Sequence, residues 1–391
     1  MKFGFDNTEV AFAHRTTREL KRARWMFGLI AWPWMVKLGA RLTGAALWLR
    51  LPIGWAMRPV FNYFCGGEDI EASQATIERM AKYGVRTVLD YSAEGQTGEA
   101  ALDHTCSQVL ATVAAADGDP RHAFAVFKVS GLSDNDLLKK VSAAISLSAD
   151  EEKAWDRVQG RVRSICEATK AAGGRVMIDA EETWLQGAID GLAEAMMAAC
   201  NGETAAVFTT VQMYRHDRLD YVKQLIEKSQ DQGFIAGIKI VRGAYMEKER
   251  AHAEKLGQVD PIQLDKAACD RDFDAAIQCC LGAVDRVHFV CATHNEQSSQ
   301  VLAESMARES LGADDVRISF AQLLGMSDHI SFNLAAAGHH VAKYVPYGPL
   351  REAIPYLLRR ASENTSVGGQ TTRELDLIRT ELLRRKGKNK S

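Results

Sequence analysis

Two adjacent arginines near the carboxyl terminus form the clearest candidate binding site in the sequence. In the segment PYLLRRASEN, the side chains of Tyr356, Arg359, Arg360 and Glu363 share one face if the segment is helical. Neighbouring guanidinium groups repel each other unless an anion lies between them, and their N–H forks bind a carboxylate bidentately. The segment therefore predicts a pocket for a small carboxylate, and the alternative is a solvated Arg–Glu helix surface.

Further polar residues stand where short apolar runs of the chain end. They are Asp90 and Glu94, Lys128, Asp179 and Glu181, Gln212, Arg242 and Tyr245, Thr293, His294 and Asn295, Gln322, and Tyr344. Structural interpretations are also possible: Lys128 can point to solvent, and His294 can be a hydrogen-bonded structural histidine. Asp179 and Glu181 can pair with a Lys or Arg of a neighbouring strand. Their common placement favours a catalytic or binding site, because a purely structural protein has no reason to gather them.

The elements that would position these residues are eight β-branched runs that alternate with helical segments. The runs are VRTVLDYS, HAFAVFKVS, GRVMIDAEE, AAVFTTVQMY, IAGIKIVRGAY, RVHFVCATHN, DVRISFAQLLG and HHVAKYVPYG. Near-continuous apolar strands between helices are typical of a parallel sheet covered on its outside. Eight units predict an α/β fold with a closed (β/α)8 barrel, whose carboxyl strand ends carry the chemistry. A doubly wound open sheet is the alternative, but the sequence has no G-x-G-x-x-G and no Walker A loop.

Residues 1–84 are expected to form a helical segment, and residues 85–391 the barrel with a carboxyl-terminal helix and a basic tail, RRKGKNK. Within the first segment, Asp69 and Gly84 are predicted to cap a helix over the intervening residues. Five of the seven tryptophans fall in the first 55 residues, beside Lys and Arg: Trp25, Trp32, Trp34, Trp48 and Trp55. Such a mixture suits a membrane interface, and the alternative is that these faces pack against the protein.

The composition of the chain excludes several classes of function. The chain has 391 residues, with 48 basic and 50 acidic side chains and a net charge of −2, so a general nucleic-acid binder is not expected. The eight cysteines include no C-x-x-C and suit reduced thiols in the cytoplasm, and no metal site is expected. No signal peptide or transit peptide is recognisable.

The motifs of the chain resemble those of monofunctional proline dehydrogenases, and they are closer to the mitochondrial-type branch than to the bifunctional bacterial proteins. The matching motifs are FCGGE (64–68), LDYSAEG (89–95), IDAEE (178–182), KIVRGAYM (239–246), ATHN (292–295), QLLGM (322–326), YVPYG (344–348) and YLLRRASEN (356–364). They follow the family's order over about residues 5 to 370. The resemblance implies a distorted (β/α)8 barrel that binds FAD and oxidises L-proline to Δ1-pyrroline-5-carboxylate.

The resemblance also implies residue roles. Arg359, Arg360 and Lys128 would bind the proline carboxylate, Asp179 would be the active-site aspartate, and Glu94 would pair with Arg359 over the substrate. The proline ring would be walled by Tyr245, Leu323, Tyr344 and Tyr356. FAD would be contacted by Gln212, Lys239, Val241, Arg242, Gly243, Thr293, His294, Asn295 and Glu363. Lys239 replaces an arginine of the bifunctional bacterial enzymes, as in the mitochondrial type.

Other functions remain open at this point. Hydroxyproline dehydrogenase is the nearest alternative, but that branch carries a smaller residue at the position of Tyr344. A Schiff-base aldolase with Lys128 or Lys239 as nucleophile is a more remote one, and a non-catalytic carboxylate-binding barrel is a third. For the proline dehydrogenase, the expected electron acceptor is a membrane quinone. The expected location is the cytoplasm, with peripheral contact at the inner face of a bacterial membrane.

Overall fold

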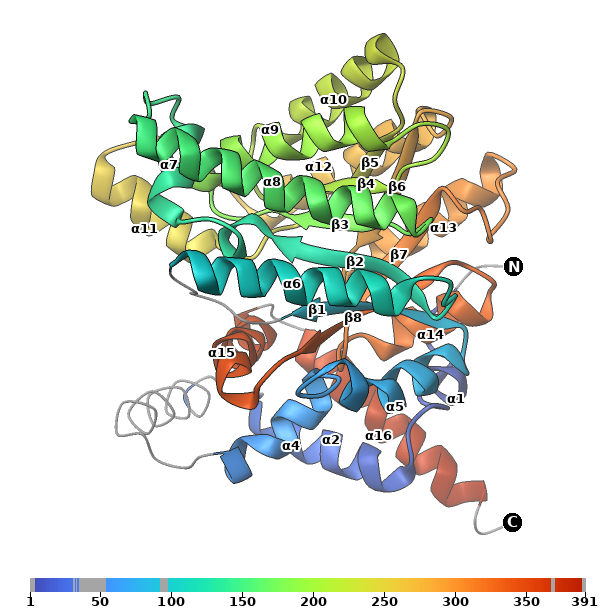
Figure 1. The fold of residues 1–391 in the computed structure, drawn as a ribbon. Helices are drawn as coiled ribbons and strands as arrows, with labels where there is room; N and C mark the ends of the chain where they lie inside the picture. Colours follow the sequence, from blue (N-terminus) through green and yellow to red (C-terminus); the bar gives the residue numbers. More distant parts are fainter. Residues whose placement is uncertain are drawn as a thin grey trace.

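The fold is that of a computed structural model (Figure 1). The structure describes residues 4–30, 32, 34, 54–91, 98–366 and 370–388, without the side chains of residues 29, 30, 55, 56 and 359–371.

Eight parallel strands form a closed barrel in the order of the sequence, β1 to β8, with β8 pairing back onto β1. The strands are β1 (Val85–Tyr91), β2 (His122–Lys128), β3 (Val176–Asp179), β4 (Val207–Gln212), β5 (Ala236–Val241), β6 (Val287–Ala292), β7 (Ile318–Leu323) and β8 (Val341–Tyr347). The predicted (β/α)8 barrel is confirmed.

Helices surround the barrel and follow each strand. They are α6 (Glu99–Ala116), α7 (Asn135–Ser142), α8 (Ala149–Ala171), α9 (Thr183–Cys200), α10 (Arg218–Gln232), α11 (Met246–Leu256), α12 (Lys266–Gly282), α13 (Glu296–Arg308), α14 (Asp328–Ala336) and α15 (Leu350–Ser366). The ends of the chain add α1 (Thr8–Ala11), α2 (Thr17–Ile30), α4 (Gly54–Phe64), α5 (Ile70–Ala81) and α16 (Gln370–Lys388). In Figure 1 the arrow of β2 points toward the side on which α11 and α15 lie.

The strands are apolar on both faces because they separate two cores. Successive side chains alternate between the outer face, which packs on the helices, and the barrel interior. The interior core contains Val88, Phe124, Val126, Met177, Phe208, Val290, Ala321, Ala342 and Tyr344. The much larger outer core contains the residues between them, such as Leu89, Ile178 and Val345. This alternation decides which polar side chains point into the barrel.

The predicted helix before β1 is present, but it ends before the expected glycine. Asp69 caps α5, since its side chain accepts a hydrogen bond from the N–H of Ala72 at 2.7 Å. The helix ends at Ala81 with Lys82 as its C-cap. Gly84, at φ +75°, instead ends the turn that follows.

The carboxyl-terminal helix packs against the amino-terminal helices. Phe12, Leu20 and Phe27 share an apolar cluster with Ile378 and Leu382 of α16. The Thr8 hydroxyl also donates to the Glu381 carboxylate at 3.0 Å. In Figure 1, α16 accordingly lies beside α1 and α2.

Three tryptophans of the amino-terminal cluster are exposed, with exposed fractions of 69% for Trp25 and 59% each for Trp32 and Trp34. For these three, the expectation that they pack against the protein is wrong. Trp48 and the side chain of Trp55 lie outside the described residues. Among the helices that the structure describes, none is both long and apolar enough to cross a membrane.

Candidate active site

Four polar side chains meet inside the carboxyl end of the barrel. Lys128 and Asp179 are the last residues of β2 and β3, Lys239 lies in β5 and Tyr344 in β8. Lys128 and Asp179 lie two positions after the interior residues Val126 and Met177, and therefore point inward. Lys239 likewise lies four positions after Ile235, an interior residue directly before β5, and Tyr344 belongs to the interior core itself. Four strands thus contribute one side chain each to a single cluster.

Lys239 is the centre of this cluster. Its Nζ donates hydrogen bonds to the Asp179 carboxylate and to Tyr344 Oη, the latter at 2.6 Å. The ammonium group also lies 4.8 Å from the centre of the Tyr344 ring. Burial lowers the pKa of Lys239, although Asp179 opposes this effect. A desolvated ammonium held by two fixed acceptors is a directional donor.

Asp179 lies between two lysines. One carboxylate oxygen binds Lys239, and the other lies 3.6 Å from Lys128 Nζ. Burial would raise the pKa of Asp179, but the two lysines outweigh it and leave that pKa below its usual range. The sequence interpretation that Asp179 and Glu181 pair with a Lys or Arg of a neighbouring strand is confirmed for Asp179, through Lys128 of β2. It is wrong for Glu181, whose carboxylate binds Ser130 among the described residues. The Asp179 carboxylate is a poor proton acceptor and a good positioning group.

Tyr344 completes the cluster from β8. Its hydroxyl donates to Met177 Sδ at 2.9 Å and accepts the hydrogen bond from Lys239. Burial raises the pKa of Tyr344 well above its usual value, so the phenol stays neutral. The ring is 7% exposed and is therefore a wall of the interior. Met177 was not among the predicted site residues, although its inward position two residues before Asp179 was a usable signal.

Glu181 lies directly behind the cluster. Its carboxylate accepts hydrogen bonds from the N–H of Ser130, at 2.9 Å, and from the Ser130 hydroxyl. The Glu181 carbonyl oxygen accepts from Gln212 Nε2 at 2.7 Å. Burial raises the pKa of Glu181 to about 7 against these donors. Glu181 therefore connects the turn after Lys128 with the ends of β3 and β4. The side chain of Gln212, a predicted FAD contact, is hydrogen-bonded to the backbone of the protein.

Arg242 connects the end of β5 with α12, α13 and the segment after β6. Its guanidinium group pairs with Asp270 at 2.7 Å and donates to the hydroxyls of Thr293 and Ser298 at 2.6 and 2.9 Å. The group also lies 4.2 Å from the centre of the Phe273 ring. The local pattern did not identify Asp270 and Ser298, because they come from α12 and α13.

The segment after β6 is held by its own hydrogen bonds. Ser298 N–H donates to the Asn295 side chain at 3.1 Å, so Asn295 caps α13. His294 Nδ1 lies 3.0 Å from Ser327 Oγ, which agrees with the interpretation of His294 as a hydrogen-bonded histidine. Gly243 has φ +128°, and a Cβ there would lie 2.4 Å from the ring of Tyr214. Packing alone therefore requires glycine at this position.

Apolar and aromatic residues border the same end of the barrel. Leu323 and Val241, at the ends of β7 and β5, are half-buried, as is Tyr245 at the start of α11. Tyr356 of α15 is buried in a cluster that α15 forms with α4, and Leu323 packs against that cluster. This arrangement places an apolar border beside the charged cluster.

Four predicted site residues cannot be placed. Glu94 lies outside the described residues, and so do the side chains of Arg359, Arg360 and Glu363. The backbone of the last three belongs to α15, which confirms that the PYLLRRASEN segment is helical.

The residues at this end of the barrel fit a flavin dinucleotide. Lys239, Lys128 and Gln212 offer N–H donors, and Val241 and Leu323 offer an apolar bed for a planar ring. Thr210, beside Lys239 in the strand register, has a buried hydroxyl without a partner among the described residues. Fixed donors around an apolar bed are what a flavin ring with polar edges requires.

Residues 73–373 match the model of a family described as proline dehydrogenase. The chain is 34% identical to the carbapenem antibiotics biosynthesis protein CarD of Pectobacterium carotovorum over 86% of this chain and 87% of that protein. It is 29% identical to mitochondrial proline dehydrogenase 1 of Arabidopsis thaliana, over 98% and 87% of the two chains. It is also 29% identical to hydroxyproline dehydrogenase of Xenopus laevis, over 96% and 88%.

Among solved structures, the chain is similar to proline utilization A of Bdellovibrio bacteriovorus inactivated by N-propargylglycine. The TM-score is 0.72 at 18% sequence identity, over 81% of this chain. The match spans 34% of that longer chain and supports the barrel fold. From the family match and the shared barrel, we conclude that this chain belongs to the proline dehydrogenase family, whose members are flavin-dependent oxidoreductases acting on the CH–NH group of proline.

Proposed function

We propose that this chain oxidises L-proline to Δ1-pyrroline-5-carboxylate with FAD and that the electrons then pass to a membrane quinone. The observation that carries the proposal is the Lys128–Asp179–Lys239–Tyr344 cluster inside the carboxyl end of the barrel, in a chain of this family. Carboxyl strand ends are the place of catalysis in (β/α)8 enzymes.

Substrate binding rests on cations. Arg359 and Arg360 stand on consecutive positions of α15 and would hold the proline carboxylate with forked hydrogen bonds. Lys128, whose Nζ already lies 3.6 Å from Asp179, would be a third cation at the opposite side of the carboxylate. Tyr344, Leu323, Tyr356 and Tyr245 would enclose the apolar ring, and Glu94 would pair with Arg359 over it. Fixing the ring at both ends removes most of its freedom before reaction.

The same cations would favour the reactive form of the substrate. The amine of proline must lose its proton before C5 can be oxidised, because the nitrogen lone pair forms the new C=N bond. Like charges and desolvation both lower the pKa of an amine. Lys128 and Lys239 supply the charge, and the buried interior supplies the desolvation. Asp179 would then act by holding the two lysines rather than by taking a proton.

FAD, when bound, supplies the two-electron oxidant that removes a hydride from C5. The residues that would hold FAD are Gln212, Lys239, Val241, Arg242, Gly243, Thr293, His294, Asn295 and Glu363. Lys239 would present an N–H to the flavin ring while Asp179 and Tyr344 fix its position. Arg242 would act through Thr293, since its guanidinium donors are engaged with Asp270, Thr293 and Ser298.

The proposal is tested by adding L-proline to the purified protein without oxygen. Bleaching of the visible flavin absorbance is expected. A protein that binds proline but leaves its flavin oxidised would be a carboxylate-binding barrel, and the proposal would be wrong. A protein without flavin that borohydride traps covalently with its substrate would instead be a Schiff-base aldolase.

Hydroxyproline oxidation is the second candidate, because hydroxyproline dehydrogenases are among the relatives. Tyr344 favours proline, since the hydroxyproline branch carries a smaller residue at this position, and its hydroxyl already accepts from Lys239 at 2.6 Å. Steady-state kinetics with both substrates decides between them. A higher kcat/KM for hydroxyproline would reverse the assignment.

We further infer that residues 1–84 form a helical unit that contacts the membrane peripherally, at the inner face of a bacterial membrane. Exposed Trp25, Trp32 and Trp34 support this, as do the exposed basic residues Lys21 and Arg24 on α2. Indole rings beside cations suit the headgroup region of a bilayer.

A further inference from the structure

Four basic side chains gather at the amino-terminal mouth of the barrel, at the end opposite the candidate active site. They are Arg86 in β1, Arg175 directly before β3, His288 in β6 and His340 directly before β8. Each stands two residues before a member of the interior core, in the order Val88, Met177, Val290 and Ala342. Because side chains alternate along a strand, all four point to the interior side of the barrel wall.

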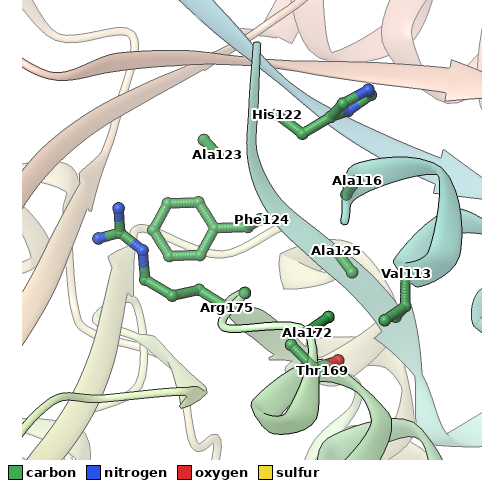
Figure 2. A pocket seen from close by; sticks show the side chains of 10 residues that line it. Val113, Ala116, His122, Ala123, Phe124, Ala125, Thr169, Ala172 and Arg175 are labelled. Atoms are coloured by element: carbon green, nitrogen blue, oxygen red, sulfur yellow. The ribbon is translucent and has the colours of Figure 1, made fainter. Parts of the chain in front are cut away.

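Neither arginine is paired with a carboxylate of the described residues. Within the described part of the chain, Arg86 has no hydrogen bond and no ion pair, and burial lowers its pKa. Arg175 donates to the carbonyl oxygen of Val316 at 3.2 Å, and its guanidinium group lies 5.0 Å from the centre of the Phe124 ring (Figure 2). Burial, reinforced by the charge of Arg86, lowers the pKa of Arg175 to about 10. Two like charges thus share one mouth.

The nearby carboxylates are engaged elsewhere. Asp315 and Asp285 each pair with Arg317 at 2.7 Å. Asp315 acts on His288, and Asp314 acts on His340, but each histidine still has a lowered pKa. No carboxylate of the described residues raises the pKa of Arg86 or Arg175. Like-charged guanidinium groups in one partly buried space repel each other, and an anion that lies between them relieves this repulsion.

The histidines add neutral donors rather than charge. Burial lowers the pKa of His288 to about 4, with Arg175 and Arg317 acting in the same direction. The ring is therefore neutral at pH 7, and because its Nδ1 accepts from the N–H of Ala205 at 3.3 Å, Nε2 carries the proton. His340 Nε2 donates to the carbonyl oxygen of Asp314 at 2.9 Å. The mouth therefore offers two guanidinium forks and an imidazole N–H.

We propose that the amino-terminal mouth of the barrel binds a small tetrahedral oxyanion, with Arg86 and Arg175 as its guanidinium ligands. The guanidinium fork matches the oxygens of a tetrahedral dianion such as phosphate. The apolar interior core, which includes Val126 and Met177, separates this site from Lys239 and Asp179. The small recess between β2, α6 and α8 adjoins this site, because Phe124 and Arg175 line it together with small side chains such as Ala116 and Ala172 (Figure 2).

The test is a titration of the flavin-loaded protein with inorganic phosphate at constant ionic strength. Calorimetry should show saturable binding, and the midpoint of thermal unfolding should rise with phosphate and level off, because a ligand that binds the folded state stabilises it. Arg86→Gln and Arg175→Gln should each weaken binding by about tenfold or more, as expected for a lost charged hydrogen bond. Without phosphate, Arg86→Gln should be at least as heat-stable as the original protein, since a repelling charge is gone and no hydrogen bond or ion pair of the described residues is lost.

The matched control is Arg163→Gln, which removes an exposed arginine of α8 and should bind phosphate unchanged. Arg86→Lys keeps the charge but loses the fork and should also bind less tightly, so the test does not depend on a charge deletion that disturbs folding. KM for proline should be unchanged in every variant. Non-saturable stabilisation equal in all proteins would overturn the proposal, as would tighter binding of succinate, which would indicate a carboxylate site instead.

Discussion

Lys239 Nζ donates to Tyr344 Oη at 2.6 Å across the interior of the barrel, from β5 to β8. The same ammonium group binds Asp179 of β3, so three strands meet at one nitrogen. This contact makes Tyr344 more than a wall of the pocket, because its hydroxyl helps to fix the donor that would face the flavin.

Removing only that hydroxyl tests the contact. Tyr344→Phe should lower kcat/KM for proline by about tenfold, since a hydrogen bond to a charged group contributes about 1.5 kcal/mol or more. Steady-state kinetics measures this, and the flavin spectrum should shift because Lys239 loses an acceptor. The control is Tyr221→Phe, which removes a hydroxyl that donates to Glu194 at 3.0 Å outside the barrel. Equal kinetics for Tyr344→Phe and the original protein would contradict the assigned role.

Asp179 should matter for stability as well as activity. Asp179→Asn leaves the buried Lys239 and the partly buried Lys128 without this counter-charge, and breaking a buried ion pair costs about 3 kcal/mol of unfolding free energy. Urea unfolding at pH 7 measures the loss. Asp136→Asn breaks the exposed pair with Lys139 and should cost almost nothing. Similar losses of unfolding free energy in the two variants would contradict the prediction, because the buried ion pairs of Asp179 would then contribute no more than an exposed pair.

The arginine pair should govern substrate affinity. Arg360→Ala should raise KM for proline by about 30-fold or more, because it removes charged hydrogen bonds to the carboxylate, while FAD stays bound. Arg351→Ala alters an exposed arginine of the same helix and is the matched control. The measurement is KM together with the flavin content of each purified variant. An unchanged KM would remove Arg360 from the carboxylate site.

Glu181 should give stability a pH dependence near neutrality. Burial raises the pKa of its carboxyl to about 7 in the folded protein, against a usual value of 4.5. The stability that this group contributes is therefore complete below pH 4.5 and is lost as the pH rises through about 7. Glu181→Gln should remove this loss. The difference in thermal unfolding midpoint between the variant and the original protein should therefore shift in favour of the variant as the pH rises from 5 to 8. The control is Glu152→Gln, at an exposed position of α8, whose thermal midpoint should change with pH in the same way as that of the original protein.

The exposed tryptophans should carry membrane binding. Replacing Trp25, Trp32 and Trp34 together with Gln should weaken sedimentation with anionic lipid vesicles by about tenfold or more, because each buried indole contributes well over 1 kcal/mol. Circular dichroism should be unchanged, since all three are exposed. The control is the double variant Val259→Gln and Leu264→Gln, which removes apolar side chains that are 85% and 91% exposed at another place on the surface. Vesicle binding that survives the triple replacement would remove the tryptophans from the interface.

The strands could be located from the sequence because their signal is local. Each run is apolar on both faces, since one face packs on helices and the other on the barrel interior. The end of α5 was less predictable. Gly84 N–H does donate to the carbonyl oxygen of Ala81, the last residue of the helix, at 3.0 Å, but Gly84 stands at the end of the turn and Lys82 is the C-cap. The place where the helix ends depends on how the chain enters β1.

The packing partners of the chain ends could not be predicted in this way. Helix α16 follows the barrel in sequence, yet Ile378 and Leu382 pack on Phe12 and Leu20 near the amino terminus. Apolar periodicity identifies a buried face, but it does not identify the surface that buries it.

The sequence by itself determined the eight strands, the family and the polar side chains at the strand ends, because alternation and motifs are properties of short segments. Only the tertiary structure decided which of those side chains touch. Closing the barrel brings Lys239 to Tyr344, 105 residues away, and places Asp179 between two lysines. It also brings Arg86 and Arg175 to the same mouth at the opposite end of the barrel. These contacts depend on the register and closure of all eight strands, which no local pattern contains.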